Sequence, residues 1–494
     1  EMGGDSATHF LASTMFAKSD YILGVESEED MVFGTLRTFK PVSYVNSGLL
    51  MKSIYPNVEA LECYNLFVVF GIFVLFLTGS TMYTALISFA KKRQHRIWAV
   101  IVALICMLGY PLNSFLFGFE YLSMGLLMIC TVLSLINYYD KDTLPLKWFI
   151  PIMFLVNLGL FLSYYMFVVF TYPAQWIYFC LKNYTETKRI VTKELIIILL
   201  ATLLIPFVLG YIYTIAPNLY KVLIDNSVDI GNVMENSSYL VNSGFKLNGY
   251  IYINFYSNML LLLPLPIYLF INDIIHKRVK NNAFIYMMIL FTISFIVLLL
   301  IGNNLEKVSV YYLSKNYFAL WIILLYCNYQ ALINLSGEGN YLPRLILGLY
   351  VFLMIICTIF SNVQVENRLK NPYEDLLAVM DIFGANKDLI LNKIEEFNQE
   401  ELEVLRYAKK NIDYDSEIEI VTDEDAYYWQ YTILQHLNKR DENIKYGGQT
   451  KLLYKYQFLE DSIDEVDYMI YFNKSLKYKE IVLNAIEKEK MNHE

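Results

Sequence analysis

A carboxylate and a histidine near the start of the chain are the first candidates for chemistry. Asp5 and His9 stand four residues apart in "EMGGDSATHF", so a helix beginning after the glycines would bring them onto one face. A carboxylate so placed can act as a general base towards an attacking hydroxyl, and a neighbouring histidine can orient it or tune its ionisation. An ordinary solvated helix start, with Asp5 near the N-cap, fits the same pattern.

A lysine among tyrosines is the second candidate. In "VSVYYLSKNYFALW" (308–321), Lys315 follows Tyr311, Tyr312 and Ser314 at the start of an apolar run. An ammonium at a helix end attracts phosphate, and tyrosine hydroxyls can add hydrogen bonds. These residues therefore predict a clamp for a lipid-linked phosphate. The alternative is a lysine that extends to the membrane interface within an aromatic belt.

Two further turns carry polar or aromatic side chains. In "GYPLNSFLFGFEYLSMG" (109–125), Pro111 interrupts an apolar run. The polar residues that gather in this turn are Asn113, Ser114, Glu120 and Tyr121. Irregular backbone at membrane depth survives only where it is buried in protein or lines a cavity, although a plain helix hairpin explains this segment equally well. Tyr164 and Tyr165, in "FLSYYMFVVFTYPAQW" (161–176), could contact sugar or lipid, or act as interfacial anchors.

The elements that must position these residues are membrane-spanning helices. The chain has 494 residues and is 56% hydrophobic, whereas soluble domains are about 45–50% apolar. Its uncharged runs reach the roughly 20 residues that cross a bilayer, so the fold class is a polytopic α-helical membrane protein. We predict ten spans, at 63–90, 97–118, 122–139, 148–163, 165–181, 194–216, 250–272, 283–301, 316–334 and 345–361.

The basic loops predict the orientation of these spans. "KKRQHR" (91–96) is the strongest basic cluster, and cytoplasmic loops carry the excess of Lys and Arg. Residues 182–189 and 276–280 fall on the same side only if the chain turns at "SYYMF", between the fourth and fifth spans. Residues 1–62 and the tail that begins at 362 then lie outside the cytoplasm.

The tail differs from the rest of the chain in charge. Residues 362–494 carry 17 Lys/Arg and 28 Asp/Glu, against 22 and 20 in the remainder, which indicates a separate acidic module. Its patterns predict a small soluble α/β domain with helices at 398–412, 423–438 and 475–490 and strands at 417–423 and 466–472. We therefore predict three domains: an external first loop with amphipathic helices (1–62), a transmembrane domain (63–361) and an extracytoplasmic domain (362–494).

The sequence offers no cofactor motif. Its six cysteines lie in or beside apolar runs without metal-ligand spacing, and neither a Walker motif nor GxGxxG occurs. We find no carboxylate cluster suited to a divalent ion, so we expect no metal or cofactor, and no nucleic-acid partner. The richness in Ile, Asn, Lys and Tyr is typical of an AT-rich bacterial genome, which suggests a bacterial cytoplasmic membrane.

Three segments together resemble the GT-C superfamily of integral-membrane glycosyltransferases, especially its bacterial members. "GGDSATHF" is similar to an acidic first external loop, "YPLNSFLFGFEYLSMG" to a short external turn, and "SVYYLSKNYFALW" to a late Tyr-Tyr-x-x-Lys element. Family members have a transmembrane helix before the first loop. We therefore expect such a helix before residue 1, which would bring the count to eleven spans.

The resemblance implies transfer of a sugar from a polyprenyl-phosphate donor to a cell-surface glycan or wall polymer such as teichoic acid, outside the membrane. It assigns the general base to Asp5, with Glu1 as the fallback, and lets His9 orient Asp5 or contact a substrate. It assigns the donor phosphate to Lys315, helped by Tyr311 or Tyr312. The alternatives are a transporter or flippase of a lipid-linked envelope precursor, and a non-catalytic scaffold for wall assembly.

Overall fold

The protein is represented by a computed structural model of residues 1–494, in which the chain forms two compact units. The first consists of Glu1–Gly71, Leu116–Glu120 and Asn392–Glu494, and the second of Ile72–Phe115 and Tyr121–Leu391. The structure describes residues 9–10, 12–14, 16–17, 42–55, 63–116, 118–215, 262–304, 310–337, 418–422, 444–446 and 468–472. The predicted domain boundaries at 62 and 361 stay predictions.

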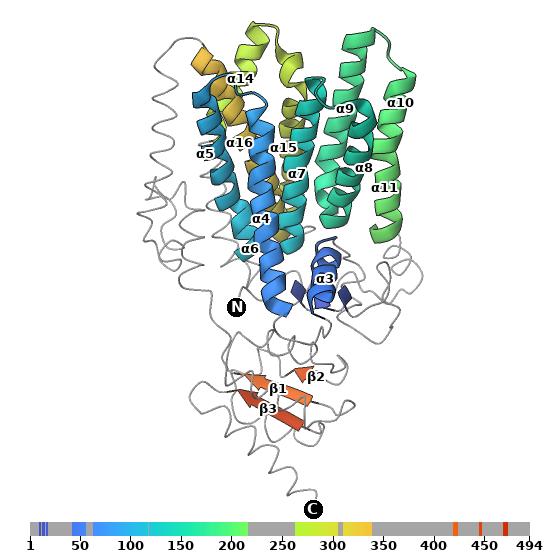
Figure 1. The fold of residues 1–494 in the computed structure, drawn as a ribbon, viewed down its shortest axis with the longest axis vertical. Coiled ribbons are helices and arrows are strands. Elements are labelled where there is room, and N and C mark those ends of the chain that lie inside the picture. The colour runs from blue at the N-terminus through green and yellow to red at the C-terminus, as the bar shows by residue number, and fades with distance from the viewer. Residues whose placement is uncertain are drawn as a thin grey trace, which may run out of the picture. The chain divides into compact units, whose positions relative to one another are not determined.

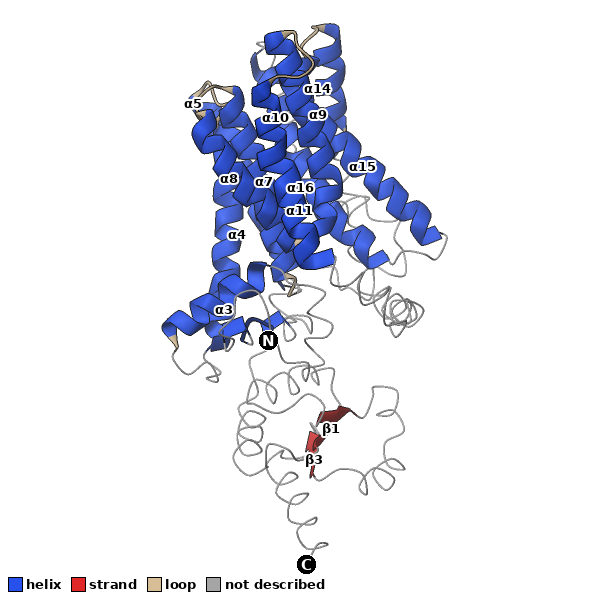
Figure 2. Ribbon diagram, turned by 90° about the vertical axis from the view of Figure 1, so that its right-hand side faces the viewer, coloured by secondary structure: helices blue, strands red, loops and turns tan. Residues whose placement is uncertain are grey.

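The helices of the transmembrane region run side by side (Figures 1 and 2). In chain order they are α4 (Cys63–Ile87), α5 (Arg93–Leu108), α6 (Tyr110–Leu116), α7 (Glu120–Asp140), α8 (Leu146–Ser163), the 3-10 turn η1 (Tyr165–Phe167) and α9 (Val168–Thr187). A single run of helix then combines α10 (Lys193–Leu199), η2 (Leu200–Leu204), α11 (Ile205–Gly210) and η3 (Tyr211–Ile215). The last are α14 (Pro264–Ile275), the 3-10 turn η4 (Val279–Asn282), α15 (Ala283–Asn304) and α16 (Val310–Gly337).

Within the described residues, seven helices are long and apolar enough to cross a membrane. They are Cys63–Ile87, Arg93–Leu116, Glu120–Asp140, Leu146–Ser163, Lys193–Ile215, Ala283–Gly302 and Lys315–Leu335. Each corresponds to a predicted span, which supports a multi-pass helical membrane protein. Of the other three predicted spans, 165–181 is the less apolar helix α9, 250–272 is described only in part as α14, and 345–361 lies outside the described residues. The count of ten stays a prediction.

Helix α16 is the core of the bundle. Every residue from Lys315 to Leu332 is buried, as expected of a helix surrounded by other helices. The neighbouring helices instead expose large apolar side chains, among them Phe76 on α4, Leu155 on α8 and Leu298 on α15, each more than 60% exposed. Such faces are costly in water and suit the hydrocarbon of a bilayer.

The turns that follow α4, α7, α9 and α14 lie at the same end of the bundle (Figure 1). Contacts link the first three of these regions: Lys141 donates to the Ser88 carbonyl, and Lys182 Nζ, near the end of α9, lies 3.0 Å from an Asp140 carboxylate oxygen. The basic clusters at 91–96, 182–189 and 276–280 lie in or next to three of these turns. The orientation in the membrane that they predict stays a prediction. The chain also turns between α8 and α9 at "SYYMF", as predicted.

The described N-terminal residues pack in the first unit against helix α3 (Val42–Ile54) and the start of α4. The rings of Phe10 and Phe67 meet edge to face at 5.8 Å between centroids, and the Ser47 hydroxyl donates to the Ser13 hydroxyl at 2.6 Å. Gly48 permits the close approach, because a Cβ there would lie 2.5 Å from the Ser13 carbonyl oxygen.

The described part of the tail is a three-stranded parallel sheet. Strands β1 (Ile418–Thr422), β2 (Ile444–Tyr446) and β3 (Tyr468–Phe472) are arranged in the order β2-β1-β3. Strands β1 and β3 fall on the predicted strands at 417–423 and 466–472, whereas β2 was not predicted. Parallel neighbours require crossover connections, and the predicted helices that would supply them lie outside the described residues.

Candidate functional site

A buried lysine at the start of α16 is the chemically most distinctive group among the described residues of the bundle. Lys315 is 1% exposed. Its ammonium donates a hydrogen bond to the Tyr121 hydroxyl and lies 4.8 Å from the centroid of that ring. Burying an ammonium costs much free energy unless hydrogen bonds or opposite charge compensate it. An ionisable residue so placed in a membrane protein is a functional candidate by default.

Tyr121 is positioned by an irregular connection between α6 and α7. Helix α5 ends at Leu108, and a Cβ at the following Gly109 would lie 2.1 Å from the ring of Trp321. Helix α6 follows, with Pro111 as its second residue. Gly118 then takes a left-handed backbone conformation, with φ of 81°, which glycine adopts without strain. The described residues of this connection, Gly118 and Phe119, are buried in protein.

Tyr164 extends the aromatic surroundings of Lys315. It ends α8 in an extended conformation and is buried. Its ring centroid lies 5.9 Å from that of Tyr121, 6.4 Å from that of Tyr165 and 4.7 Å from that of Phe167. The structure therefore brings together three of the predicted site residues, Lys315, Tyr121 and Tyr164, and places Tyr165 beside them.

The other polar residues of the 109–125 turn are also buried. Asn113 and Ser114 have no exposed surface, and Glu120 is 3% exposed. The Ser123 hydroxyl donates to the Ser114 hydroxyl at 3.1 Å, which links α6 to α7. Glu120 is the first residue of α7, where a carboxylate interacts favourably with the helix dipole. For Ser114, the structure therefore indicates a structural role.

Four of the predicted site residues cannot be placed. Asp5 and Glu1 lie outside the described residues, and so do the side chains of Tyr311 and Tyr312 in the first turn of α16. The pairing of Asp5 with His9 stays a prediction.

His9 has a partner that the sequence did not suggest. Its Nδ1 shares a hydrogen bond with the Tyr44 hydroxyl, and the two rings stack at 5.2 Å. Both residues are buried. Tyr44 lies on α3, 35 residues further along the chain. A histidine held through one ring nitrogen has a fixed orientation, which suits either a structural or a positioning role.

The described residues contain no group of three or more His, Cys, Asp or Glu side chains that could hold a metal ion. Comparisons of the chain with known protein families, curated protein sequences and solved structures find no match. The resemblance to GT-C glycosyltransferases therefore rests only on the three short segments quoted above, at residues 3–10, 110–125 and 309–321.

Proposed function

We propose that this protein is a membrane glycosyltransferase that moves a sugar from a polyprenyl-phosphate donor to a cell-surface glycan. The observation that carries this proposal is the burial of Lys315 against Tyr121, whose ring in turn contacts Tyr164. An ammonium attracts phosphate, and its low-dielectric surroundings strengthen that attraction. Tyrosine hydroxyls and ring faces suit the sugar and the lipid.

The proposed reaction uses residues from the first loop and from the start of α16. Asp5, or Glu1 in its place, removes the proton from an acceptor hydroxyl as the oxygen attacks the anomeric carbon. The bond from that carbon to the phosphate oxygen breaks with inversion, and polyprenyl phosphate leaves with its negative charge facing Lys315. Tyr311 and Tyr312 assist with the phosphate, while His9, held by Tyr44, orients the base or a substrate.

We further propose that the protein resides in a bacterial cytoplasmic membrane, with its first loop and the acidic α/β tail outside the cytoplasm. Its lipid contacts would be the exposed apolar faces of α4, α8 and α15. A non-catalytic scaffold that binds through the tail would retain its function without Lys315. Substitution of Lys315 therefore distinguishes the scaffold from the glycosyltransferase.

The proposal is tested by substituting the lysine in the full-length protein. Lys315→Met removes the charge, whereas Lys315→Arg keeps it, and sugar transfer is measured with membrane vesicles and the extracted lipid-linked donor pool. We expect transfer to fall at least 100-fold with methionine and to be partly retained with arginine. Equal transfer by the wild type and Lys315→Met, at equal amounts of folded protein, would exclude this role. Asp5→Asn tests the base in the same assay.

A transporter or flippase is the second candidate, because Asn157 and Gln175 place polar groups within the bundle. Their amides, however, bond to each other at 2.9 and 3.0 Å, which favours a structural link over a substrate site. Flipping of a fluorescent lipid by the reconstituted protein, abolished by Asn157→Leu, would support the transporter.

A further inference from the structure

The turns that follow α4, α7, α9 and α14, with the helix ends beside them, carry a large excess of positive charge. They comprise residues 88–96, 138–148, 182–194 and 273–282. These four segments contain 13 Lys/Arg and 5 Asp/Glu, a net charge of +8 in a chain whose total is -9. The connections at the opposite ends of α5 and α8, residues 109–119 and 163–167, contain no Lys or Arg. The charge of these helices is therefore concentrated at one end.

Nearly all of these cations are exposed and lack an acidic partner. Among the described residues of the four segments, Lys182 alone forms ion pairs, at 3.0 Å from Asp140 and 3.2 Å from Glu186. Lys141 donates to the Ser88 carbonyl. The other eleven cations are exposed and form no ion pair with a described residue. We call these eleven side chains the basic surface. Like charges gathered in this way repel one another, so the surface suits an anionic partner.

Helix stability does not explain this charge. Lys92 and Arg93 stand at the N-cap and the first position of α5, and Lys147 is the second residue of α8. Positive charge is unfavourable at the N-terminus of a helix, because the helix dipole has its positive end there. These three cations therefore lower the stability of their own helices, and an external anion would offset that loss.

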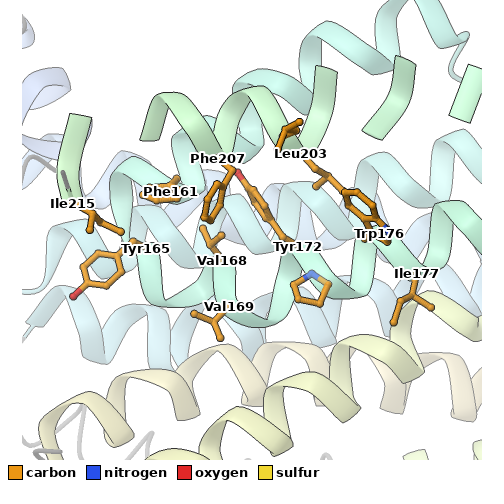
Figure 3. A pocket seen from close by; sticks show the side chains of 12 residues that line it. Phe161, Tyr165, Val168, Val169, Tyr172, Trp176, Ile177, Leu203, Phe207 and Ile215 are labelled. Atoms are coloured by element: carbon orange, nitrogen blue, oxygen red, sulfur yellow. The ribbon is translucent and has the colours of Figure 1, made fainter. Parts of the chain in front are cut away.

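Exposed apolar side chains adjoin the basic surface. Ile97, Trp148 and Ile275 each lie within two residues of one of its cations, and they are 52%, 57% and 68% exposed. An apolar groove runs along α9, and Trp176 and Ile177, at one end of it in Figure 3, are the lining residues nearest in sequence to the α9–α10 turn. A nucleic acid or a soluble acidic protein would leave such side chains in water, which is costly. An anionic phospholipid offers a charged head group and hydrocarbon together.

We propose that the basic surface binds the head groups of anionic phospholipids in the leaflet that it faces, while Ile97, Trp148 and Ile275 contact the upper parts of their acyl chains. Lys and Arg next to a membrane are attracted by the negative surface potential of anionic lipids, and tryptophan is enriched at the level of the head groups. These lipids are partners rather than substrates, so their binding does not depend on the proposed reaction.

The test measures the lipid preference of the full-length protein in phosphatidylcholine vesicles. Electron spin resonance compares the association of spin-labelled phosphatidylglycerol with that of spin-labelled phosphatidylcholine. Both leaflets have the same composition, so the result does not depend on the orientation of the protein. We expect the wild type to prefer phosphatidylglycerol about fourfold at low salt. At about 1 M salt, where the Debye length is about 3 Å, the preference should disappear.

Two variants change the charge in opposite directions. Lys92→Gln/Arg93→Gln/Lys147→Gln removes three cations and should lower the preference to about twofold. Its unfolding temperature in detergent should not fall, because the substitutions relieve the repulsion at the two helix N-termini. Asp142→Asn is the control. It removes an exposed acid from the turn after α7 and should leave the preference unchanged or raise it.

Equal association of the two lipids with the wild type would overturn the proposal, as would a preference that persists at high salt. An equal fall in the folded triple variant and in Asp142→Asn would also overturn it, because the sign of the charge would then not matter. If the two lipids associate equally but short polyglutamate binds to the vesicles, the surface belongs to an acidic protein partner instead.

Discussion

At the scale of single residues, the buried charge of Lys315 serves the proposed function but lowers the stability of the protein, and the Tyr121 hydroxyl partly offsets that loss. Removing a hydroxyl that accepts from a buried cation leaves the charge poorly compensated, at a cost of about 1–3 kcal/mol. Tyr121→Phe should therefore lower the unfolding temperature measured in detergent. Lys315→Met removes the charge itself, and such replacements of buried ionic groups are often neutral or stabilising. We expect its unfolding temperature to be no lower than that of the wild type, although sugar transfer is lost.

Tyr329→Phe is the control for this prediction. The Tyr329 hydroxyl donates to the His95 carbonyl at 3.0 Å, a bond without charge that is worth about 0.5–1.5 kcal/mol. A loss for Tyr121→Phe that does not exceed that of Tyr329→Phe would contradict a charge-assisted contact. So would a Lys315→Met protein that unfolds at a lower temperature than Tyr121→Phe.

Some residues of this site could be predicted from the sequence, but the contacts between them could not. Lys315 was predicted because a cation at the edge of an apolar run is conspicuous, and Tyr121 because Pro111 interrupts the apolar run before its turn. The contact between them joins residues 194 apart, which no local pattern encodes. Tyr44 was missed for the same reason, since a tyrosine on a short helix gives no signal of a distant histidine.

At the scale of elements, the break between α5 and α6 depends on a glycine. A Cβ at Gly109 would lie 2.1 Å from the ring of Trp321, which is 1% exposed and cannot move aside. Overpacking of this kind typically costs about 1–3 kcal/mol. Gly109→Ala should therefore lower the unfolding temperature and, because it displaces the α6–α7 connection, should also reduce sugar transfer.

Gly79→Ala provides the comparison within the same bundle. A Cβ there would lie 3.2 Å from the side chain of Met107, which is flexible enough to yield. We expect a change below about 0.5 kcal/mol, the size of an ordinary surface substitution. Equal destabilisation by the two alanines would show that the fit between Gly109 and Trp321 does not set the break.

The elements themselves were largely predictable, because apolar length and basic turns locate helices and their common end. The π-helical turns within 193–215 were not. This run reads as a uniform apolar helix, and its altered hydrogen bonding accompanies a contact between Thr202 and Asn157, 45 residues away. Where tertiary contacts reshape a helix, hydrophobic pattern alone cannot reveal the change.

At the scale of the whole molecule, the two ends of the helical bundle have different chemistry. One end carries the basic turns, and the other carries Lys315 and its tyrosines, so the orientation in the membrane decides which compartment the candidate site faces. The positive-inside rule predicts that the basic end is cytoplasmic. The proposed reaction requires this orientation, since its glycan acceptor lies outside the cell.

Single cysteines can decide the orientation. Ile190, in the turn between α9 and α10, is 80% exposed. Lys307 lies between the predicted spans 283–301 and 316–334, on the side that the predicted topology places outside the cytoplasm. With a membrane-impermeant maleimide, Lys307→Cys should label in intact cells, whereas Ile190→Cys should label only after permeabilisation. The unsubstituted protein is the background control, because four of its five described cysteines are buried and the fifth is partly buried. The reverse pattern would place Lys315 on the cytoplasmic side, where the lipid-linked donor would have to be used before it crosses the membrane, and would exclude transfer to a surface glycan.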